Sequence, residues 1–186
     1  MRNNFNISFL EVGDIILEHT NFNPKEDKVS ILSVLIRFFT NNYWNHAKYV
    51  VLDNKGRVVI QEALAQGIVQ RTPQEALVGR DIIVMKPAQA LNKVEKAYYC
   101  ELAEELIGVK YDYFGTLLFQ LIKQLTGIWL GSRDIKLNTP KYCSEAPITL
   151  HYFVKGIIKK PWGYAPSDIR NDNYFKPFWA GIIENV

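Results

Sequence analysis

The chain has 186 residues, of which 48% are hydrophobic and 22% charged, and its formal net charge is +3 at pH 7. These values are typical of a globular domain large enough to bury a core, and we expect residues 1–186 to form one such domain. The sequence has no basic stripe with interleaved aromatic residues, so it does not favour nucleic acid as a partner. The most apolar stretch, residues 114–131, is interrupted by Gln120, Lys123 and Gln124, so we expect no transmembrane segment.

The N-terminal residues, MRNNFNISFLEVGD, lack the apolar core of a signal peptide. Two cysteines do not make a disulfide framework, and a reduced thiol fits a cytoplasmic setting. We therefore expect a cytoplasmic protein, while the sequence leaves open delivery outside the cell by a route without a leader. Oligomeric state is not encoded in any of these features.

Strand patterns dominate the first half of the chain. VGDIIL (Val12–Leu17) predicts a short buried strand, and residues 29–39 predict a helix after a polar loop. Residues 47–64 form the clearest hairpin, with two β-branched runs around Asp53-Asn54-Lys55-Gly56. GIVQRT and DIIVMKP predict two further strands.

Helical patterns dominate the second half. Residues 92–108 predict a helix in which Asn92 and Glu95 form a capping box and Gly108 closes the C-terminal end. The apolar face of this helix is predicted to carry Val94, Tyr98, Leu102 and Leu106. A second apolar helix is predicted over residues 115–130 and a third from near Cys143 towards Gly156. Strands followed by helices indicate an α+β fold.

Cys143 is the first candidate for chemistry. Pro147 has no N–H and fits only the first turn of a helix, so the third helix must begin close to Cys143. A sulfur at a helix N-terminus lies where free N–H groups and the dipole favour a thiolate. The alternative is a half-buried cysteine that only packs, which is the interpretation that we favour for Cys100 in the middle of its helix.

A cysteine nucleophile needs a base, and the chain has three histidines. His46 lies where a strand is expected to begin, and His19 lies at the end of another. His151 follows Cys143 by about two helical turns, which is too far along the axis to reach the thiol. His46 is therefore the candidate base.

The hairpin supplies a partner for His46. If Gly56 takes the left-handed position of a type I turn with a bulge, Asp53 faces Arg57 and Lys48 faces Glu62. His46 and Glu62 are then diagonal neighbours on one sheet face, where a carboxylate could orient the imidazole. A two-residue turn would put them on opposite faces. The alternative for Glu62 is an exposed strand carboxylate.

Five short motifs occur in a characteristic order: VGDIIL (Val12–Leu17), NHAKYVV (Asn45–Val51), VIQEALAQGIVQRT (59–72), KYDYFG (110–115) and KYCSEA (141–146). In this order they resemble the NlpC-type papain-like cysteine peptidases. The similarity is to the circularly permuted branch, with the YiiX/YaeF-like bacterial proteins and, more distantly, the lecithin–retinol acyltransferase family. In that branch the histidine precedes the cysteine, as it does here.

The resemblance extends from Val12 to about Gly156, and Pro166–Asp168 extends it further. It implies a circularly permuted papain-like fold, with an antiparallel sheet packed against helices and the nucleophile at a helix N-terminus. It also implies that Gly13 and Asp14 fix the opening strand and its turn.

The same resemblance implies a role for each site residue. Cys143 would be the nucleophile, His46 the general base and Glu62 the residue that orients the base. Tyr111 and Asp112 would lie near the substrate pocket. No cofactor and no metal ion is expected, because the sequence has no convincing cluster of metal ligands.

These residues favour a cysteine hydrolase that cleaves an amide bond, in a peptide, an isopeptide or a cell-wall-type peptide, through a thioester. One alternative is lipid acyl transfer or acyl-ester hydrolysis by the same triad, with residues 29–39 and 114–130 lining an acyl pocket or touching a membrane. A second alternative is a non-catalytic binding module on this fold.

Overall fold

The computed structural model describes residues 5–19, 43–64, 66–112, 122, 126, 136–137, 139–156 and 163–184. The helices and strands of these residues follow in this order: η1 (Ile7–Phe9), β1 (Ile15–His19), β2 (His46–Leu52), β3 (Val58–Leu64), β4 (Gly67–Arg71), α2 (Pro73–Leu77), β5 (Asp81–Pro87), α3 (Lys93–Glu105), α5 (Glu145–Lys155), α6 (Pro166–Asn171) and β6 (Phe175–Ile182). The predicted helix at residues 29–39 lies outside the described residues, as does that at 115–130 apart from Ile122 and Thr126.

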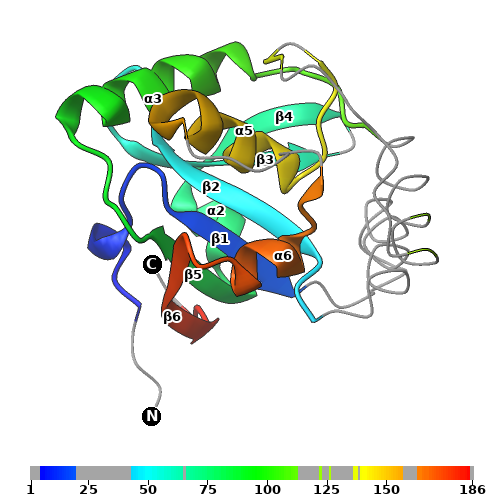
Figure 1. The fold of residues 1–186 in the computed structure, drawn as a ribbon. Coiled ribbons are helices and arrows are strands. Elements are labelled where there is room, and N and C mark those ends of the chain that lie inside the picture. Colours follow the sequence, from blue (N-terminus) through cyan, green and yellow to red (C-terminus); the bar gives the residue numbers. More distant parts are fainter. Residues whose placement is uncertain are drawn as a thin grey trace.

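Six strands form one antiparallel sheet in the order β4-β3-β2-β1-β5-β6, as Figure 1 shows. β1 lies inside the sheet because it pairs with both β2 and β5, so that Leu17 faces Ala47 on one side and Ile83 on the other. The predicted α+β class and the antiparallel sheet packed against helices are confirmed.

The β2–β3 hairpin has the predicted turn. Gly56 adopts a left-handed φ of +73°. The N–H of Asp53 donates to the carbonyl of Arg57 at 2.9 Å, and the N–H of Gly56 donates to the carbonyl of Asp53 at 2.9 Å. Lys48 therefore pairs with Glu62, which confirms the register that places His46 and Glu62 on one sheet face.

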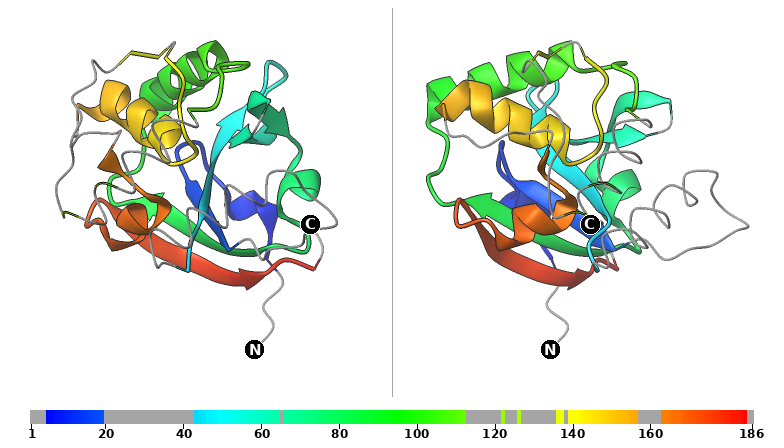
Figure 2. Two further views of the ribbon diagram at one scale, coloured as in Figure 1. Left: turned by 90° about the vertical axis from the view of Figure 1, so that its right-hand side faces the viewer. Right: turned by 45° about the vertical axis from the view of Figure 1, so that its right-hand side comes forward.

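The two faces of the sheet carry separate cores, because successive side chains of a strand point to opposite faces. On one face Leu17, Tyr49 and Val51 pack beneath α3 and α5, which lie side by side in Figures 1 and 2. On the other face a second cluster lies under α2 and the N-terminal segment: Phe5, Leu10, Ile16, Val50, Ile60, Ala76, Leu77, Ile82, Val84 and Ile183. The sheet is thus covered on both sides.

The capping box of α3 is confirmed, but part of its predicted apolar face is wrong. The Asn92 side chain accepts from the N–H of Glu95, and the Glu95 carboxylate accepts from the N–H of Asn92. Val94 and Tyr98, however, are 77% and 42% exposed. The buried stripe is centred on Tyr99 instead, with Leu102, Ala103 and Leu106, and the two exposed residues lie roughly 100° or more around the helix from it.

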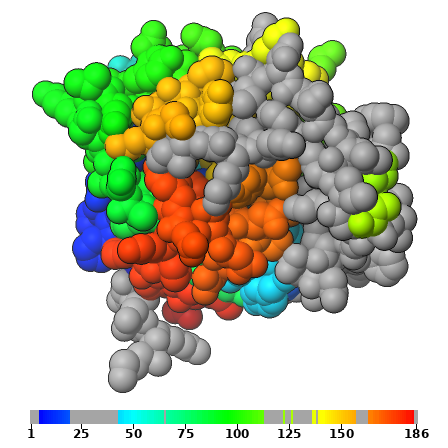
Figure 3. All heavy atoms as spheres, in the orientation of Figure 1, coloured from blue at the N-terminus to red at the C-terminus, as the bar shows by residue number. Residues whose placement is uncertain are grey.

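The C-terminal residues form α6 and β6, which the sequence patterns did not predict. β6 is an edge strand, and its residues are mostly exposed, so it lacks a clear alternation. Pro177 lies in it next to the register shift at Val84–Met85, a position where an edge strand tolerates proline. Figure 3 shows these C-terminal residues, coloured orange to red, on the same face of the molecule as α5.

Gly67 provides a test of the packing between β4 and the turn after α3. Its φ is +119°, and a Cβ there would lie 2.8 Å from the carbonyl oxygen of Val109. We expect Gly67→Ala to lower the free energy of unfolding by about 3 kcal/mol, because backbone strain and a backbone clash add. Urea unfolding at neutral pH measures the change.

Gly56→Ala is the matched control, because Gly56 also has a positive φ but no atom lies within 4 Å of a Cβ built there. It should lower the free energy of unfolding by only about 1 kcal/mol. Equal losses in the two variants would show that the contact with Val109 contributes nothing.

Candidate functional site

The start of α5 fixes the position of Cys143. The carbonyl of Tyr142 accepts hydrogen bonds from the N–H groups of Glu145 at 3.1 Å and Ala146 at 3.3 Å, so Cys143 lies in the turn that opens the helix. Pro147 lies in the first turn of α5, where its missing N–H is tolerated. The helix predicted to begin near Cys143 and to end at Gly156 is confirmed.

The sulfur of Cys143 lies where β2 separates from β3. The pairing of these strands ends at Lys48 and Glu62, so Ala47 is the first residue beyond it. The N–H of Ala47 donates a hydrogen bond to the sulfur instead. Cys143 is only 1% exposed, so the thiol is buried.

The segment after α3 contributes a second donor. Tyr111 forms a parallel bridge with Lys141, and its side chain donates a hydrogen bond to the sulfur of Cys143. Asp112, the other predicted pocket residue, donates its N–H to the carbonyl of Lys141 at 3.2 Å and is 9% exposed. The structure thus brings Tyr111 to the thiol and places Asp112 beside Lys141.

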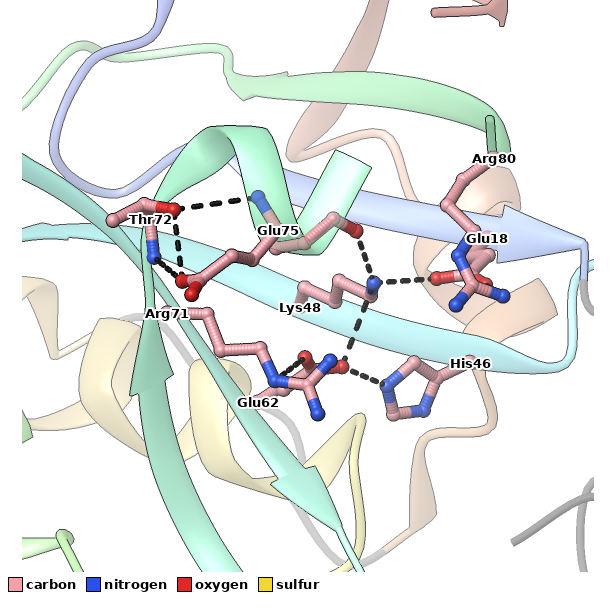
Figure 4. Close-up of polar contacts among 9 residues, drawn as sticks. Glu18, His46, Lys48, Glu62, Arg71, Thr72, Glu75 and Arg80 are labelled. Atoms are coloured by element: carbon pink, nitrogen blue, oxygen red, sulfur yellow. Dashed lines mark hydrogen bonds and ion pairs between the residues drawn. The ribbon is translucent and has the colours of Figure 1, made fainter. Parts of the chain in front are cut away.

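His46 connects Cys143 to Glu62. Its Nε2 lies 2.9 Å from Oε2 of Glu62, and Figure 4 shows the ring directed at this carboxylate. The imidazole also forms a hydrogen bond with the thiol of Cys143. Because Nε2 faces Glu62, Nδ1 is the nitrogen that remains for the sulfur. Glu62 is 1% exposed, so it is not the exposed strand carboxylate of the alternative interpretation.

The electrostatics of the three groups are linked. Burial lowers the pKa of His46, but its hydrogen bonds to Cys143 and Glu62 outweigh burial and raise that pKa to about 10. Burial raises the pKa of Cys143, but the hydrogen bond and charge of His46 outweigh it and lower that pKa. Thiolate and imidazolium therefore stabilise each other.

Glu62 remains ionised in this environment. Burial raises its pKa, but the hydrogen bond from His46 and the charges of Lys48 and Arg71 outweigh burial and lower that pKa to about 2. Cys143, His46 and Glu62 thus form a continuous hydrogen-bonded line from α5 to β3. Such a line can hold a proton on the imidazole next to a sulfur anion.

The other cysteine and histidines lie elsewhere. Cys100 belongs to α3 and lies at the edge of the core, where burial raises its pKa. His151 is 2% exposed and contacts the carbonyl of Gly13 at 2.9 Å, and burial lowers its pKa to about 4. His19 lies against Tyr43, its Nδ1 2.7 Å from the Tyr43 carbonyl oxygen.

Gly13 lies at the entrance to β1. Its φ is +93°, and a Cβ there would lie 2.7 Å from Cδ1 of Leu91. Asp14 accepts a hydrogen bond from the N–H of Glu11 at 2.9 Å and an ion pair from Lys86 at 2.8 Å. The two residues shape the turn before the opening strand, as the resemblance implied.

Two buried charged residues of the site were not identified as functional from the sequence. The hairpin register predicts that Lys48 faces Glu62 but indicates no role for it, and no sequence pattern points to Glu18. Both are 3% exposed, and both contact the side chains around His46. Alternation within β1 could have placed Glu18 on a face, but its partners required knowledge that β1 pairs with β2.

No family model matches the chain, and no curated protein matches it. Among solved structures, the fold is similar to that of metalloprotein YiiX from Escherichia coli O157:H7, with a TM-score of 0.53 and 15% sequence identity. The match covers 93% of this chain and 98% of that one. The chain therefore has a YiiX-like α+β fold.

That neighbour is described as a metalloprotein. Within the described part of the chain, no group of three or more His, Cys, Asp and Glu side chains is arranged to hold a metal ion. At the candidate site the Nε2 atom of His46 is already engaged by Glu62.

Over the residues whose structure is described, no helix has the length and apolar character that crossing a bilayer requires.

The coupled pair predicts a pH dependence of stability. In the unfolded chain the pKa of His46 is 6.5 and that of Cys143 is 9.0, whereas folding raises the former to about 10 and lowers the latter. Between pH 9.0 and about 10 the unfolded pair has released both of its protons, whereas the folded pair still keeps one on His46. The contribution of the pair to the free energy of unfolding therefore falls as the pH rises from 9.0 to about 10.

Urea unfolding across this pH range tests the pair. The quantity compared is the difference in the free energy of unfolding between the wild type and the His46→Ala/Cys143→Ala double variant. It should decline by about 1 kcal/mol from pH 9.0 to 10, because the raised pKa of His46 exceeds the 9.0 of an unfolded cysteine by about one unit. A difference that stays constant from pH 9.0 to about 10 would show that the two groups do not share a proton.

Proposed function

We propose that the protein is a cysteine hydrolase that cleaves an amide bond, with Cys143 as nucleophile, His46 as general base and acid, and Glu62 as the residue that orients the imidazole. The observation that carries this proposal is the hydrogen-bonded line from the Cys143 thiol through His46 to Glu62, whose last contact is 2.9 Å long. A neighbouring base and an orienting carboxylate are what an activated thiol requires. The YiiX-like fold is compatible with the proposal but shows no activity.

The reaction proceeds through a thioester. The thiolate of Cys143 attacks the amide carbon, a C–S bond forms, and the carbonyl electron pair moves onto the oxygen. The backbone N–H of Cys143, in the turn that opens α5, stabilises this oxyanion. The imidazolium of His46 gives its proton to the leaving nitrogen as the C–N bond breaks. His46 then takes a proton from water, which attacks the thioester and releases the thiolate.

Tyr111 and Asp112 are proposed to bind substrate, and the hydrogen bond from Tyr111 to the sulfur favours such a role for the first of them. The substrate is proposed to be a peptide or an isopeptide. The lipid alternative depended on residues 29–39 and 114–130, which lie outside the described residues apart from Ile122 and Thr126. No described contact favours that alternative over amide hydrolysis.

One observation favours a second candidate, a non-catalytic binding module. Cys143 is 1% exposed, so a substrate carbonyl reaches the sulfur only when the surrounding residues move. A binding module needs no such movement and requires no reactive thiol. The two candidates differ in the ionisation and acylation of Cys143.

Ultraviolet absorbance of the thiolate measures ionisation without access to the sulfur. We expect the wild type to keep a thiolate signal well below the ordinary cysteine pKa of 9.0, because His46 lowers the pKa of Cys143. The signal should vanish in Cys143→Ala and move to higher pH in His46→Ala. Cys100→Ser, which removes a thiol with a raised pKa, should leave the low-pH signal unchanged.

Acylation by p-nitrophenyl acetate, followed by intact-mass spectrometry and peptide mapping, tests the nucleophile. We expect one acetyl group on Cys143 and a burst of nitrophenolate, with the rate reduced about a hundredfold or more in His46→Ala. A wild-type protein with no low-pH thiolate and no acetyl transfer would remove the hydrolase proposal and leave the binding module.

A further inference from the structure

The ammonium group of Lys48 lies between two buried carboxylates. Its Nζ is 2.6 Å from Oε2 of Glu18 and 3.5 Å from Oε2 of Glu62, the same oxygen that His46 contacts. Figure 4 shows the ammonium of Lys48 between the carboxylates of Glu18 and Glu62, on one face of β1, β2 and β3. Lys48, Glu18 and Glu62 are each exposed by 3% or less. One buried ammonium group thus forms ion pairs with two buried carboxylates.

Both carboxylates lie next to His46. Glu18 pairs with His46 directly across the β1–β2 ladder, and Glu62 is its diagonal neighbour on β3. Two arginines contact the outer oxygens: Arg71 lies 3.6 Å from Oε1 of Glu62, and Arg80 lies 3.6 Å from Oε1 of Glu18. Both arginines are about two-fifths exposed, so solvent screens their charges much more than that of Lys48.

α2 holds the ammonium in place. The carbonyl of Ala76, near the C-terminal end of this short helix, accepts a hydrogen bond from Nζ of Lys48 at 2.6 Å. Carbonyls at that end lack an intrahelical partner and favour a cation. The helix begins with a capping box between Thr72 and Glu75, so the Glu75 carboxylate is engaged at the opposite end.

Without the ammonium the two carboxylates would lose the buried cation that lies between them. Two buried carboxylates that share one site do not both stay ionised, and the pair takes up a proton. A proton on Glu62 would reverse its hydrogen bond with His46, because a carboxylic acid donates to Nε2. The remaining hydrogen would then lie on Nδ1 and point at the sulfur, and the imidazole could not accept the thiol proton.

We propose that Lys48 is a positioning residue: by neutralising Glu18 next to Glu62, it keeps Glu62 an anionic hydrogen-bond acceptor for His46. The catalytic consequence rests on the proposed function, whereas the effect of Lys48 on Glu62 does not. Lys48 acts through Glu62 and does not touch the reacting atoms. Glu18 is the group that makes the cation necessary.

The experiment compares four full-length variants with the wild type: Lys48→Met, Lys48→Arg, Glu18→Gln and the Lys48→Met/Glu18→Gln double variant. The readout is the titration of the glutamate side-chain carboxyls by carbon-13 NMR, together with urea unfolding. In Lys48→Met we expect Glu62 to titrate at a pH at least one unit higher than in the wild type, a tenfold or larger change in its proton affinity.

The double variant is the decisive control. It lacks the second carboxylate as well as the cation, so Glu62 should return to the wild-type titration and stability should recover relative to Lys48→Met. Lys48→Arg keeps a cation and Glu18→Gln removes the competing anion. In both variants we therefore expect Glu62 to titrate as in the wild type. If Lys48→Met does not fold, recovery of folding in the double variant carries the same information.

Two results would overturn the inference. One is a Glu62 titration that is unchanged in Lys48→Met, including the case in which Glu18 alone takes up the proton. The other is failure of Glu18→Gln to restore Glu62 or folding in the double variant, which would mean that Lys48 contributes only packing.

Failure of the proposed function can be distinguished from failure of the positioning role of Lys48. In Lys48→Met the proton affinity of the Cys143 thiolate, measured from its absorbance, should change about tenfold. It should return to the wild-type value in the double variant. If the wild type has no low-pH thiolate while Glu62 still responds to Lys48, the hydrolase proposal fails and the positioning role stands. If the thiolate is present and Glu62 does not respond, the positioning role fails alone.

Discussion

The candidate site depends on the pairing of Lys48 with Glu62 across the β2–β3 hairpin. This register places His46, Lys48 and Glu62 on one face of the sheet, because side chains alternate with a period of two. A shift of one residue would turn Glu62 away from both His46 and Lys48. The four-residue turn with Gly56 in the left-handed conformation is the local feature that sets this register.

Burial of these charges explains why the geometry is so constrained. Glu18, Lys48 and Glu62 are removed from water, and a buried charge is tolerated only where an opposite charge and hydrogen bonds replace solvent. The ammonium satisfies this condition with two carboxylates and a helix carbonyl. The packing of α2 on the sheet and the ionisation of Glu62 are therefore parts of one arrangement.

The thiol reaches this arrangement from the opposite side of the sheet. α5 packs with α3 over the face that carries Tyr49 and Val51, whereas His46 and Glu62 belong to the other face. The thiol and the imidazole of His46 meet where the pairing of β2 with β3 ends, at Ala47, whose N–H donates to the sulfur. The end of a ladder provides a donor without a strand partner, and Cys143 uses it.

Local features of the sequence determined several parts of this protein. The turn at Asp53–Gly56 determined the hairpin register, Pro147 determined that a helix begins near Cys143, and Asn92 with Glu95 determined the start of α3. Each depends on residues close together in the chain, so a rule of local geometry was sufficient. The face of α3 was assigned wrongly because Val94 and Tyr98 fit a helical period, and only packing against the sheet selected the stripe at Tyr99.

The tertiary structure alone decided what surrounds the candidate triad. Glu18 lies opposite His46 because β1 pairs with β2 across a long separation in the chain, and Tyr111 meets Cys143 through a bridge between distant segments. β6 could not be recognised because an exposed edge strand needs no alternating pattern. Periodicity and turn chemistry report what a residue does next to its neighbours in sequence. Which charges share a buried site depends on strand order and helix docking, and these are set by burial of the whole core.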